Sequence, residues 1–342
     1  MKRNKFIILC LTGLIFLQSC AIKPSGGTGP GADKTLAETV TETAQVTPYP
    51  DMPASAAAYH QAADLIAGSD AYVAYIDEVL GFLTAMPDRY VGGRTNREAA
   101  DYIADQMKQL GLEPFDGDDY LIPYRQNVDG KELLPDNVIG VLRGTEQMKT
   151  RAVVISCHFD TVHNTPGAVD NASGTAAMLC TARLLASIEA DNRPDIIFCA
   201  FNGEEQFYIG SQAFVRTYGG TYELLYNINY DCVGMIEGGA YMMGAAEDDI
   251  SFDLVGSVGA FLHDREILQN SCSNRDIRSD HVSFLEAGTP AICFSMNNIL
   301  SVIHSPDDTV DRIDAGAIAE LAASVTDFME WEWNDSSERG RK

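Results

Sequence analysis

The pattern of hydrophobic and polar positions predicts helices in the first part of the folded chain. Apolar residues recur at helical spacing from 56 to 86, and again after Thr95. Thr95 and Glu98 form a capping-box pattern, and Gly111 stands where a helix end favours a left-handed residue. The apolar face between them consists of Ala99, Ala100, Ile103, Ala104, Met107 and Leu110. This segment is therefore predicted to be an amphipathic helix that ends at Gly111.

From residue 152 onward, continuous apolar runs alternate with helical patterns. Such runs are typical of strands that are covered on both faces of a sheet. The predicted strands are 152–157, 195–201, 226–230 and 290–296, and the predicted helices are 175–188 (with Ser173 as N-cap), 211–218 and 315–331. Strand–helix–strand alternation predicts an α/β fold. We expect a single domain with a mostly parallel, mixed central sheet and helices on both faces.

Other segments are less regular. Tyr120–Val128 alternates like an exposed strand, and Asn137–Leu142 is predicted to be a strand broken by Gly140. Pro114–Pro135 and Gly238–Asn274 are interpreted as excursions from the sheet that lie near its functional edge.

The N-terminus has the pattern of an export signal. Lys2, Arg3 and Lys5 precede an apolar run of 12 residues, Phe6–Leu17, which is too short to span a bilayer. Leu17-Gln-Ser-Cys20 resembles a bacterial lipobox, in which the cysteine is acylated; the basic start disfavours the alternative of a buried core segment. We therefore predict a signal peptide at 1–19, a flexible tether with acylated Cys20 at 20–55, and a folded domain at 56–335. The protein is then expected to be an exported lipoprotein, anchored to the membrane through Cys20 only and facing the periplasm or the cell surface.

The charge and the cysteines exclude other classes of function. Without the three basic residues of the signal, 21 bases stand against 49 acids, a formal charge of −28. Such a surface repels phosphate backbones, so nucleic acid is not expected as a partner. Outside the signal and the anchor, six cysteines remain with no CxxC spacing. Buried free thiols are favoured for most of them over disulfides or thiolate metal ligation.

Histidines and acids stand at the ends of the predicted strands. They are His158 with Asp160 after 152–157, Glu204 with Glu205 after 195–201, Asp231 after 226–230, Asp170 in a turn before a helix, and His304 between the last strand and the last helix. Singly, each has an ordinary explanation as a surface pair, a solvated turn or a cap. Because ligands bind at the carboxyl ends of strands in open α/β sheets, the residues are jointly expected to meet at one edge of the sheet and bind metal there. Imidazole and carboxylate ligands suit Zn²⁺, with Mn²⁺ or Co²⁺ as substitutes, and there is no His-Glu-x-x-His pattern.

Five short motifs carry a resemblance to a known family. His158-Phe-Asp-Thr, Gly167-Ala-Val-Asp-Asn-Ala-Ser-Gly, Asn202-Gly-Glu-Glu, Asn229-Tyr-Asp and His304-Ser-Pro-Asp-Asp-Thr resemble, in order and spacing, the motifs of the M28 zinc peptidases. The resemblance implies two zinc ions. One would be bound by His158 and Asp231 and the other by Glu205 and His304, with Asp170 bridging. It also implies Glu204 as general base, Asp160 as the partner that orients His158, and a cis peptide bond after Asp170.

Two features near the implied pocket leave alternatives open. Arg278-Ser-Asp-His281 resembles a family segment that lines the substrate pocket. Arg278 is a candidate ligand for a substrate carboxylate or carbonyl, or else an ordinary salt-bridge residue, and His281 is structural or functional. Some aminopeptidases of this family have a Tyr just before the last His ligand, where this chain has Ile303. The oxyanion would then be stabilised by Tyr208, by a backbone amide, or by the metals alone.

The function expected from the resemblance is that of an aminopeptidase acting on peptides. The alternatives are a glutaminyl-peptide cyclotransferase with one zinc, a carboxypeptidase acting on acidic dipeptides, and a catalytically silent, lipid-anchored binding protein. Cyclases of this type have tryptophans around the pocket, whereas this chain has only Trp331 and Trp333, both in the predicted C-terminal helix. The preferred N-terminal residue and the oligomeric state are left open.

Overall fold

The computed structural model describes residues 52–128, 130–145, 151–189, 193–244, 249–272 and 277–339. The predicted signal peptide and nearly all of the predicted tether, including Cys20 with its predicted acylation, lie outside these residues. The strands are β1 (Glu113–Pro114), β2 (Leu121–Pro123), β3 (Gln126–Val128), β4 (Lys131–Leu133), β5 (Asp136–Leu142), β6 (Arg151–His158), β7 (Asp195–Phe201), β8 (Glu223–Tyr230), β9 (Tyr241–Gly244), β10 (Gln269–Cys272) and β11 (Ala291–Met296).

The helices are α1 (Gln61–Ala67), α2 (Ala71–Thr84), α3 (Arg94–Gln109), α4 (Ser173–Ser187), α5 (Ile209–Tyr218), α6 (Asp249–Asp264), α7 (His281–Glu286) and α8 (Ala315–Arg339). Shorter helical turns are η1 (Ala54–Ala58), η2 (Ala168–Ala172), η3 (Ile299–Ser301) and η4 (Val310–Arg312). The predicted helix at 56–86 is thus divided into η1, α1 and α2.

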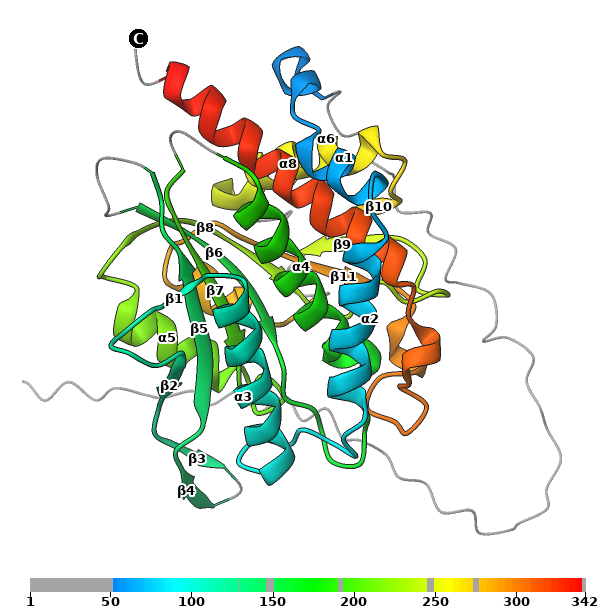
Figure 1. The fold of residues 1–342 in the computed structure, drawn as a ribbon. Coiled ribbons are helices and arrows are strands. Elements are labelled where there is room, and N and C mark those ends of the chain that lie inside the picture. The colour runs from blue at the N-terminus through cyan, green and yellow to red at the C-terminus, as the bar shows by residue number, and fades with distance from the viewer. Residues whose placement is uncertain are drawn as a thin grey trace, which may run out of the picture. The chain divides into compact units, whose positions relative to one another are not determined.

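Most strands of the described residues form one mixed sheet (Figure 1). Its order is β1-β5-β7-β6-β8-β11-β9-β10, with β2 paired to β5, while β3 and β4 form a separate hairpin. Neighbours in the series β7-β6-β8-β11 are parallel, and β5 and β9 join this series in antiparallel orientation. The predicted α/β class with a mixed central sheet is confirmed. The continuous apolar runs of β6, β7 and β11 belong to its middle, which is buried on both faces.

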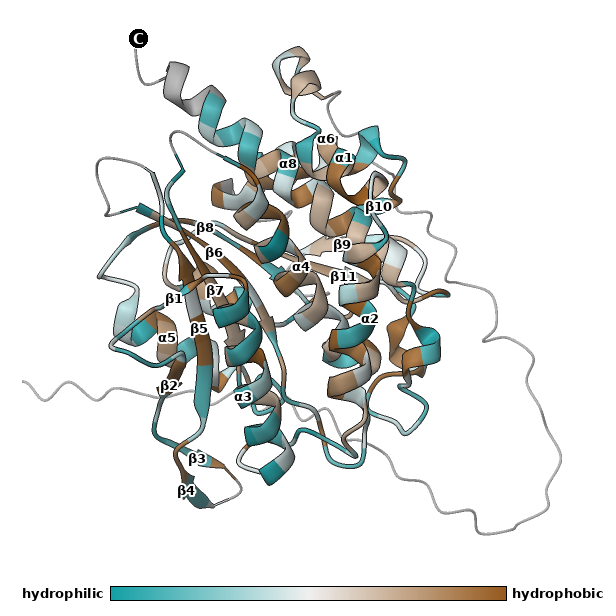
Figure 2. Cartoon of the chain, in the orientation of Figure 1, coloured by the Kyte–Doolittle hydropathy of each residue, from teal (hydrophilic) through white to brown (hydrophobic). Residues whose placement is uncertain are grey.

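Helices cover both faces of this sheet, as predicted. Residues of α2, α3, α4, α6 and α8 form one hydrophobic core against one face, and residues of α5 and α7 form a second core against the other face. The middle strands are coloured as hydrophobic in Figure 2, whereas α3 carries hydrophilic residues on its outer side. The alternation of side chains along each strand assigns Val153 and Ile155 to one core and Val154 to the other.

Helix α3 begins differently from the prediction. Its N-cap is Gly93 without a side-chain cap, and Glu98 forms an ion pair with Arg94 instead of the predicted capping box with Thr95. Its end is as predicted, because Gly111 has φ +79°. The N–H groups of Gly111 and Leu112 donate to the carbonyls of Lys108 and Met107, the Schellman pattern that lets a glycine close a helix.

Three further predictions are wrong. Gly140 does not break a strand, since β5 continues through it; a Cβ there would lie 3.0 Å from atoms of Leu112 and Met107, so the glycine lets α3 pack closely. Ser173 is inside α4, not its N-cap, and its hydroxyl donates to the carbonyl of Val169. Gly238–Asn274 is not an excursion from the sheet, because its strands β9 and β10 extend the sheet beyond β11.

The six cysteines of the described residues are all free and buried, which confirms the expectation of buried thiols. None of the described helices has the length and apolar character needed to cross a bilayer.

Candidate functional site

The candidate residues gather at the carboxyl ends of the parallel strands. His158 is the last residue of β6, and Asp231 directly follows β8, which pairs with β6 in parallel. Glu204 and Glu205 follow β7 after a turn at Gly203, whose φ of +79° suits a glycine. Strand order and direction therefore place these side chains at one edge of the sheet.

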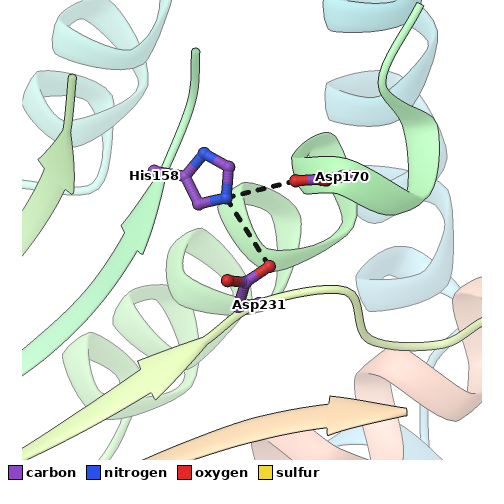
Figure 3. A group of neighbouring side chains, drawn as sticks. All are labelled: His158, Asp170 and Asp231. Atoms are coloured by element: carbon purple, nitrogen blue, oxygen red, sulfur yellow. Dashed lines mark ion pairs between the residues drawn. The ribbon is translucent and has the colours of Figure 1, made fainter. Parts of the chain in front are cut away.

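Two groups of ligand-type side chains share Asp170. In the first group, Nε2 of His158 lies 3.2 Å from Oδ1 of Asp170 and 3.5 Å from Oδ1 of Asp231 (Figure 3). In the second, Nε2 of His304 lies 3.1 Å from Oδ2 of Asp170 and 3.1 Å from Oε2 of Glu205. Within each group the donor atoms lie within 4.8 Å of one another. Asp170 thus offers one carboxylate oxygen to each group.

The donor atoms fit a bound cation. Both ring nitrogens of His158 and Oε1 of Glu205 are buried and have no hydrogen-bond partner in the described part of the chain. Buried polar atoms without a partner are costly, and bound metal ions would satisfy Nε2 of His158 and Oε1 of Glu205, whereas Nδ1 of His158 faces Asp160. The mixed nitrogen and oxygen donors are those that Zn²⁺ accepts.

The electrostatics of the site favour positive charge. The Asp170 and Glu205 carboxylates, hydrogen-bonded to His304, raise its pKa to about 10. Burial raises the pKa of Glu205 to about 7, and the Asp170 carboxylate adds to this. Burial opposes the charge on His158, but the Asp231 and Glu204 carboxylates raise its pKa well above the usual value. The site therefore retains protons, and a metal cation would take the place of this charge.

Asp160 connects His158 with the two glutamates. Its side chain is fully buried, and Oδ1 lies 3.5 Å from Nδ1 of His158. The same carboxylate accepts the backbone N–H groups of Glu204 and Glu205 at 3.1 and 3.3 Å. Asp160 therefore lies beside the imidazole and holds the backbone of the turn that carries both glutamates; that it orients His158 stays a prediction.

Two residues that hold the Asp170 turn were missed by the sequence analysis. The Asp308 carboxylate accepts the backbone N–H groups of Val169 and Asp170, at 2.6 and 3.1 Å. Arg89 is fully buried and donates to the carbonyls of Phe159 at 2.7 Å and Gly167 at 2.9 Å. The peptide bond between Asp170 and Asn171 is cis, as the resemblance implied. The one sequence signal that could have pointed to Asp308 was its place in the acidic pair Asp307-Asp308.

A buried carboxyl group near Glu204 was also missed. Asp280 is fully buried, its oxygens have no hydrogen-bond partner in the described chain, and burial raises its pKa to about 7. Burial likewise raises the pKa of Glu204 well above its usual value, with the Asp231 and Asp280 carboxylates adding to this. His281 is fully buried and does not line the pocket, and burial lowers its pKa to about 4. It is therefore a neutral interior residue.

A pocket of about 440 Å³ opens over both ligand groups. Besides the acids and His304, its described lining consists of Phe207, Tyr208, Cys232, Met242, Ile277, Arg278, Ser295, Met296, Asn297, Ile299, Leu300 and Ile303. Arg278 and Tyr208 are thus at the pocket, and Ile303 occupies the position where the family resemblance expected a tyrosine. Trp331 and Trp333 are buried in α8 as part of the hydrophobic core and do not line the pocket.

The sequence is similar to those of known peptidases. The model of peptidase family M28 matches residues 137–329. Aminopeptidase YwaD of Bacillus subtilis is 28% identical over 198 residues, which are 56% of this chain and 43% of that protein, so the chain spans less than half of this relative's length. A probable leucine aminopeptidase of Trichophyton verrucosum is 24% identical over 279 residues, covering 74% of this chain and 71% of that protein.

Solved structures with the same fold include an aminopeptidase precursor and a glutaminyl cyclase. A leucine aminopeptidase precursor from Bacteroides thetaiotaomicron has a TM-score of 0.63 at 18% identity, covering 83% of this chain and 98% of that chain. The Porphyromonas gingivalis glutaminyl cyclase has a TM-score of 0.62 at 19% identity, covering 77% and 98%. At these identities the likeness concerns the fold alone. The family model, however, matches more than half of the 342 residues, and the chain therefore belongs to peptidase family M28.

Proposed function

We propose that the protein is a metal-dependent aminopeptidase that removes N-terminal residues from peptides with two zinc ions. The observation that carries this proposal is the position of Asp170, which offers one oxygen to each of two ligand groups. His158 and Asp231 would complete one zinc site, and Glu205 and His304 the other. Two bound zinc ions would lower the pKa of a water molecule and polarise the scissile carbonyl.

Glu204 is proposed as the general base. Its backbone N–H is held by Asp160, its side chain lines the pocket, and burial raises its pKa well above the usual value. A carboxylate with a raised pKa accepts a proton from water more readily and can then donate it to the leaving amine. Glu204 is not needed to complete either ligand group, which leaves it available for proton transfer.

The similarity to a glutaminyl cyclase concerns the fold and does not favour cyclisation here. A cyclase of the expected kind uses one zinc and a tryptophan-lined pocket. In this chain a second ligand group is present, and the described pocket lining contains no tryptophan. A silent binding protein would have little use for a partly buried Glu204 beside a complete set of ligands.

The test combines metal content with turnover. Protein purified without chelator is analysed for zinc per chain and assayed on a panel of aminoacyl anilides and on a peptide with N-terminal Gln. We expect two zinc ions and anilide hydrolysis. Glu204→Gln should lower turnover by about 10²- to 10⁴-fold, the usual contribution of general acid–base catalysis, with unchanged zinc content. One zinc with cyclisation would identify a cyclase, and no metal with no turnover a binding protein.

We also propose that the domain acts outside the cytoplasm on a lipid anchor at Cys20. The lipobox-like Leu17-Gln-Ser-Cys20 after a short apolar run supports this proposal. Radiolabelled palmitate should label the wild-type protein expressed in a bacterium, and Cys20→Ala should remove both the label and the membrane fractionation. Labelling that persists in this variant would refute the anchor.

A further inference from the structure

Arg278 lies at the pocket wall and has no acidic partner among the residues that the structure describes. It is the only Arg or Lys among the described residues that line the pocket. Its side chain is exposed, and it forms no ion pair with any carboxylate of the described residues. The chain has 49 acidic residues against 24 Lys and Arg, so acidic partners are abundant on its surface. The guanidinium of Arg278 therefore keeps most of its donors available to a ligand.

Tyr208 adds a second donor at the same wall. Both residues line the pocket, and the Arg278 guanidinium lies close enough to Tyr208 to counteract part of the rise that burial causes in the Tyr208 pKa. The guanidinium can only donate hydrogen bonds, and the phenol O–H can donate one as well. The two side chains together present several N–H groups and one O–H group to the pocket.

Both side chains start from anchored backbone. Tyr208 has φ +61°, and its N–H donates to the carbonyl of Glu204 at 2.9 Å. Its carbonyl accepts the Ser211 hydroxyl at 3.1 Å, and Ser211 in turn pairs with Ser283 of α7 at 2.9 Å. Arg278 directly precedes Ser279, which is fully buried and accepts a hydrogen bond from Asn229 at 2.9 Å. The backbone at both positions is therefore held in place before a ligand binds, which lowers the entropy cost of binding.

The pocket that this pair lines also has apolar walls. Met242, Ile277, Met296, Ile299, Leu300 and Ile303 belong to its lining. A charge-assisted hydrogen bond from a guanidinium to a carboxylate is stronger than one between neutral groups. The Arg278 guanidinium therefore favours a negatively charged ligand group at this wall, in contrast to the acidic floor that the two metal-ligand groups form.

We propose that Arg278 and Tyr208 form a carboxylate-binding subsite that makes the enzyme prefer peptides with a carboxylate close to the scissile bond. This inference rests on the proposed function and specifies its substrate class. The carboxylate is either the side chain of an N-terminal Asp or Glu or the free C-terminus of a dipeptide. In both cases it accepts hydrogen bonds from the guanidinium and the phenol together, which an uncharged amide does less well.

Two pairs of matched substrates test the proposal and identify the carboxylate. The glutamyl anilide is compared with the glutaminyl anilide, and leucyl-leucine with its C-terminal amide. We expect wild type to have a higher kcat/KM for the charged member of one pair, which identifies the source. Arg278→Gln should reduce that preference by about tenfold to a hundredfold, as expected for lost hydrogen bonds to a charged group. Tyr208→Phe should reduce it by about tenfold or less.

A matched control and two outcomes make the test decisive. Arg216→Gln removes the same charge from an exposed position of α5 that does not line the pocket, and it should leave the preference unchanged. If Arg278→Gln or Tyr208→Phe lowers kcat equally for charged and neutral substrates, the pair stabilises the transition state instead and the proposal is wrong. It is also wrong if wild type prefers the charged member of neither pair.

Binding measurements distinguish a failure of this inference from a failure of the proposed function. If no substrate is hydrolysed, calorimetric titration of leucyl-leucine, its amide, glutamate and glutamine into wild type and Arg278→Gln gives the preference without turnover. Tighter binding of one charged ligand to wild type, lost in the variant, would support the subsite even if the protein is not an aminopeptidase. Equal binding of charged and neutral ligands would overturn it.

Discussion

The two ligand groups that share Asp170 are held by the fold in different ways. His158 and Asp231 stand at the ends of neighbouring parallel strands, and their side chains are 1% and 12% exposed. His304 lies in the loop between η3 and η4 with φ +57°, and its side chain is 50% exposed. The first group is thus built on the ends of buried central strands, whereas the second depends on a half-exposed loop residue. We infer that the first would hold a metal ion more firmly than the second.

The largest expected effect comes from removing the residue that both groups share. Asp170→Ala takes one ligand oxygen from each group, so the zinc content should fall from about two ions per chain to less than about one, and hydrolysis should fall to background. Metal analysis after gel filtration checks this. Asp307→Ala removes an exposed acid close to His304 and is the control. Two ions retained in Asp170→Ala would contradict a shared ligand.

The two histidines should differ in what they contribute to stability. In the metal-free protein, His158→Ala leaves the carboxylates of Asp170 and Asp231 facing each other without the imidazole between them. We expect its free energy of unfolding to fall by about 3–5 kcal/mol, the loss typical of breaking a buried charged pair. His304→Ala removes a half-exposed side chain and should cost about 1 kcal/mol or less. Urea denaturation with chelator present measures both, and equal losses would remove the distinction between the groups.

The sequence predicted the firmer of the two groups for a simple physical reason. The mostly apolar runs that form β6 and β7, and the buried second half of β8, end at polar residues that mark the carboxyl ends of the strands. Parallel pairing then brings those ends to one edge, which placed His158 and Asp231 of the firmer group close to Glu205 of the other group. His304 depended on the family motif, because a loop residue has no periodicity that predicts its position.

The residues that support the site could not be predicted in this way. Arg89 and Asp308 act on backbone groups of the Asp170 turn, and their partners exist only once that turn has formed. Gly140 was misread for a similar reason, since the close approach of Met107 and Leu112 is a tertiary contact. The strands β9 and β10 are short, and their pairing beyond β11 is not visible in a local pattern. Periodicity thus predicts elements and their ends, but not the contacts between distant segments.

The rates at which zinc leaves the two groups compare them more directly, although the expected effect is smaller. We expect a weak chelator to remove zinc from wild type in two phases whose rates differ by about tenfold or more, or about 1.4 kcal/mol of barrier. The fast phase should come from the group that contains the exposed His304. His304→Ala should then show the slow phase alone, followed with a zinc-sensitive dye. A fast phase that persists in His304→Ala would reverse the assignment.

The smallest expected effect comes from changing Asp308, which supports the shared ligand Asp170. Asp308 holds the backbone of Asp170 through two N–H groups, and it is in neither ligand group. Asp308→Asn keeps the shape but has only one acceptor oxygen, so the turn that presents Asp170 loosens. Because Asp170 serves both groups, both phases of zinc release should accelerate by the same factor, about tenfold at most, the lower end of the effect of residues behind metal ligands. Stopped-flow release with the same dye measures both phases, and acceleration of only one phase would mean that Asp170 belongs to a single metal site.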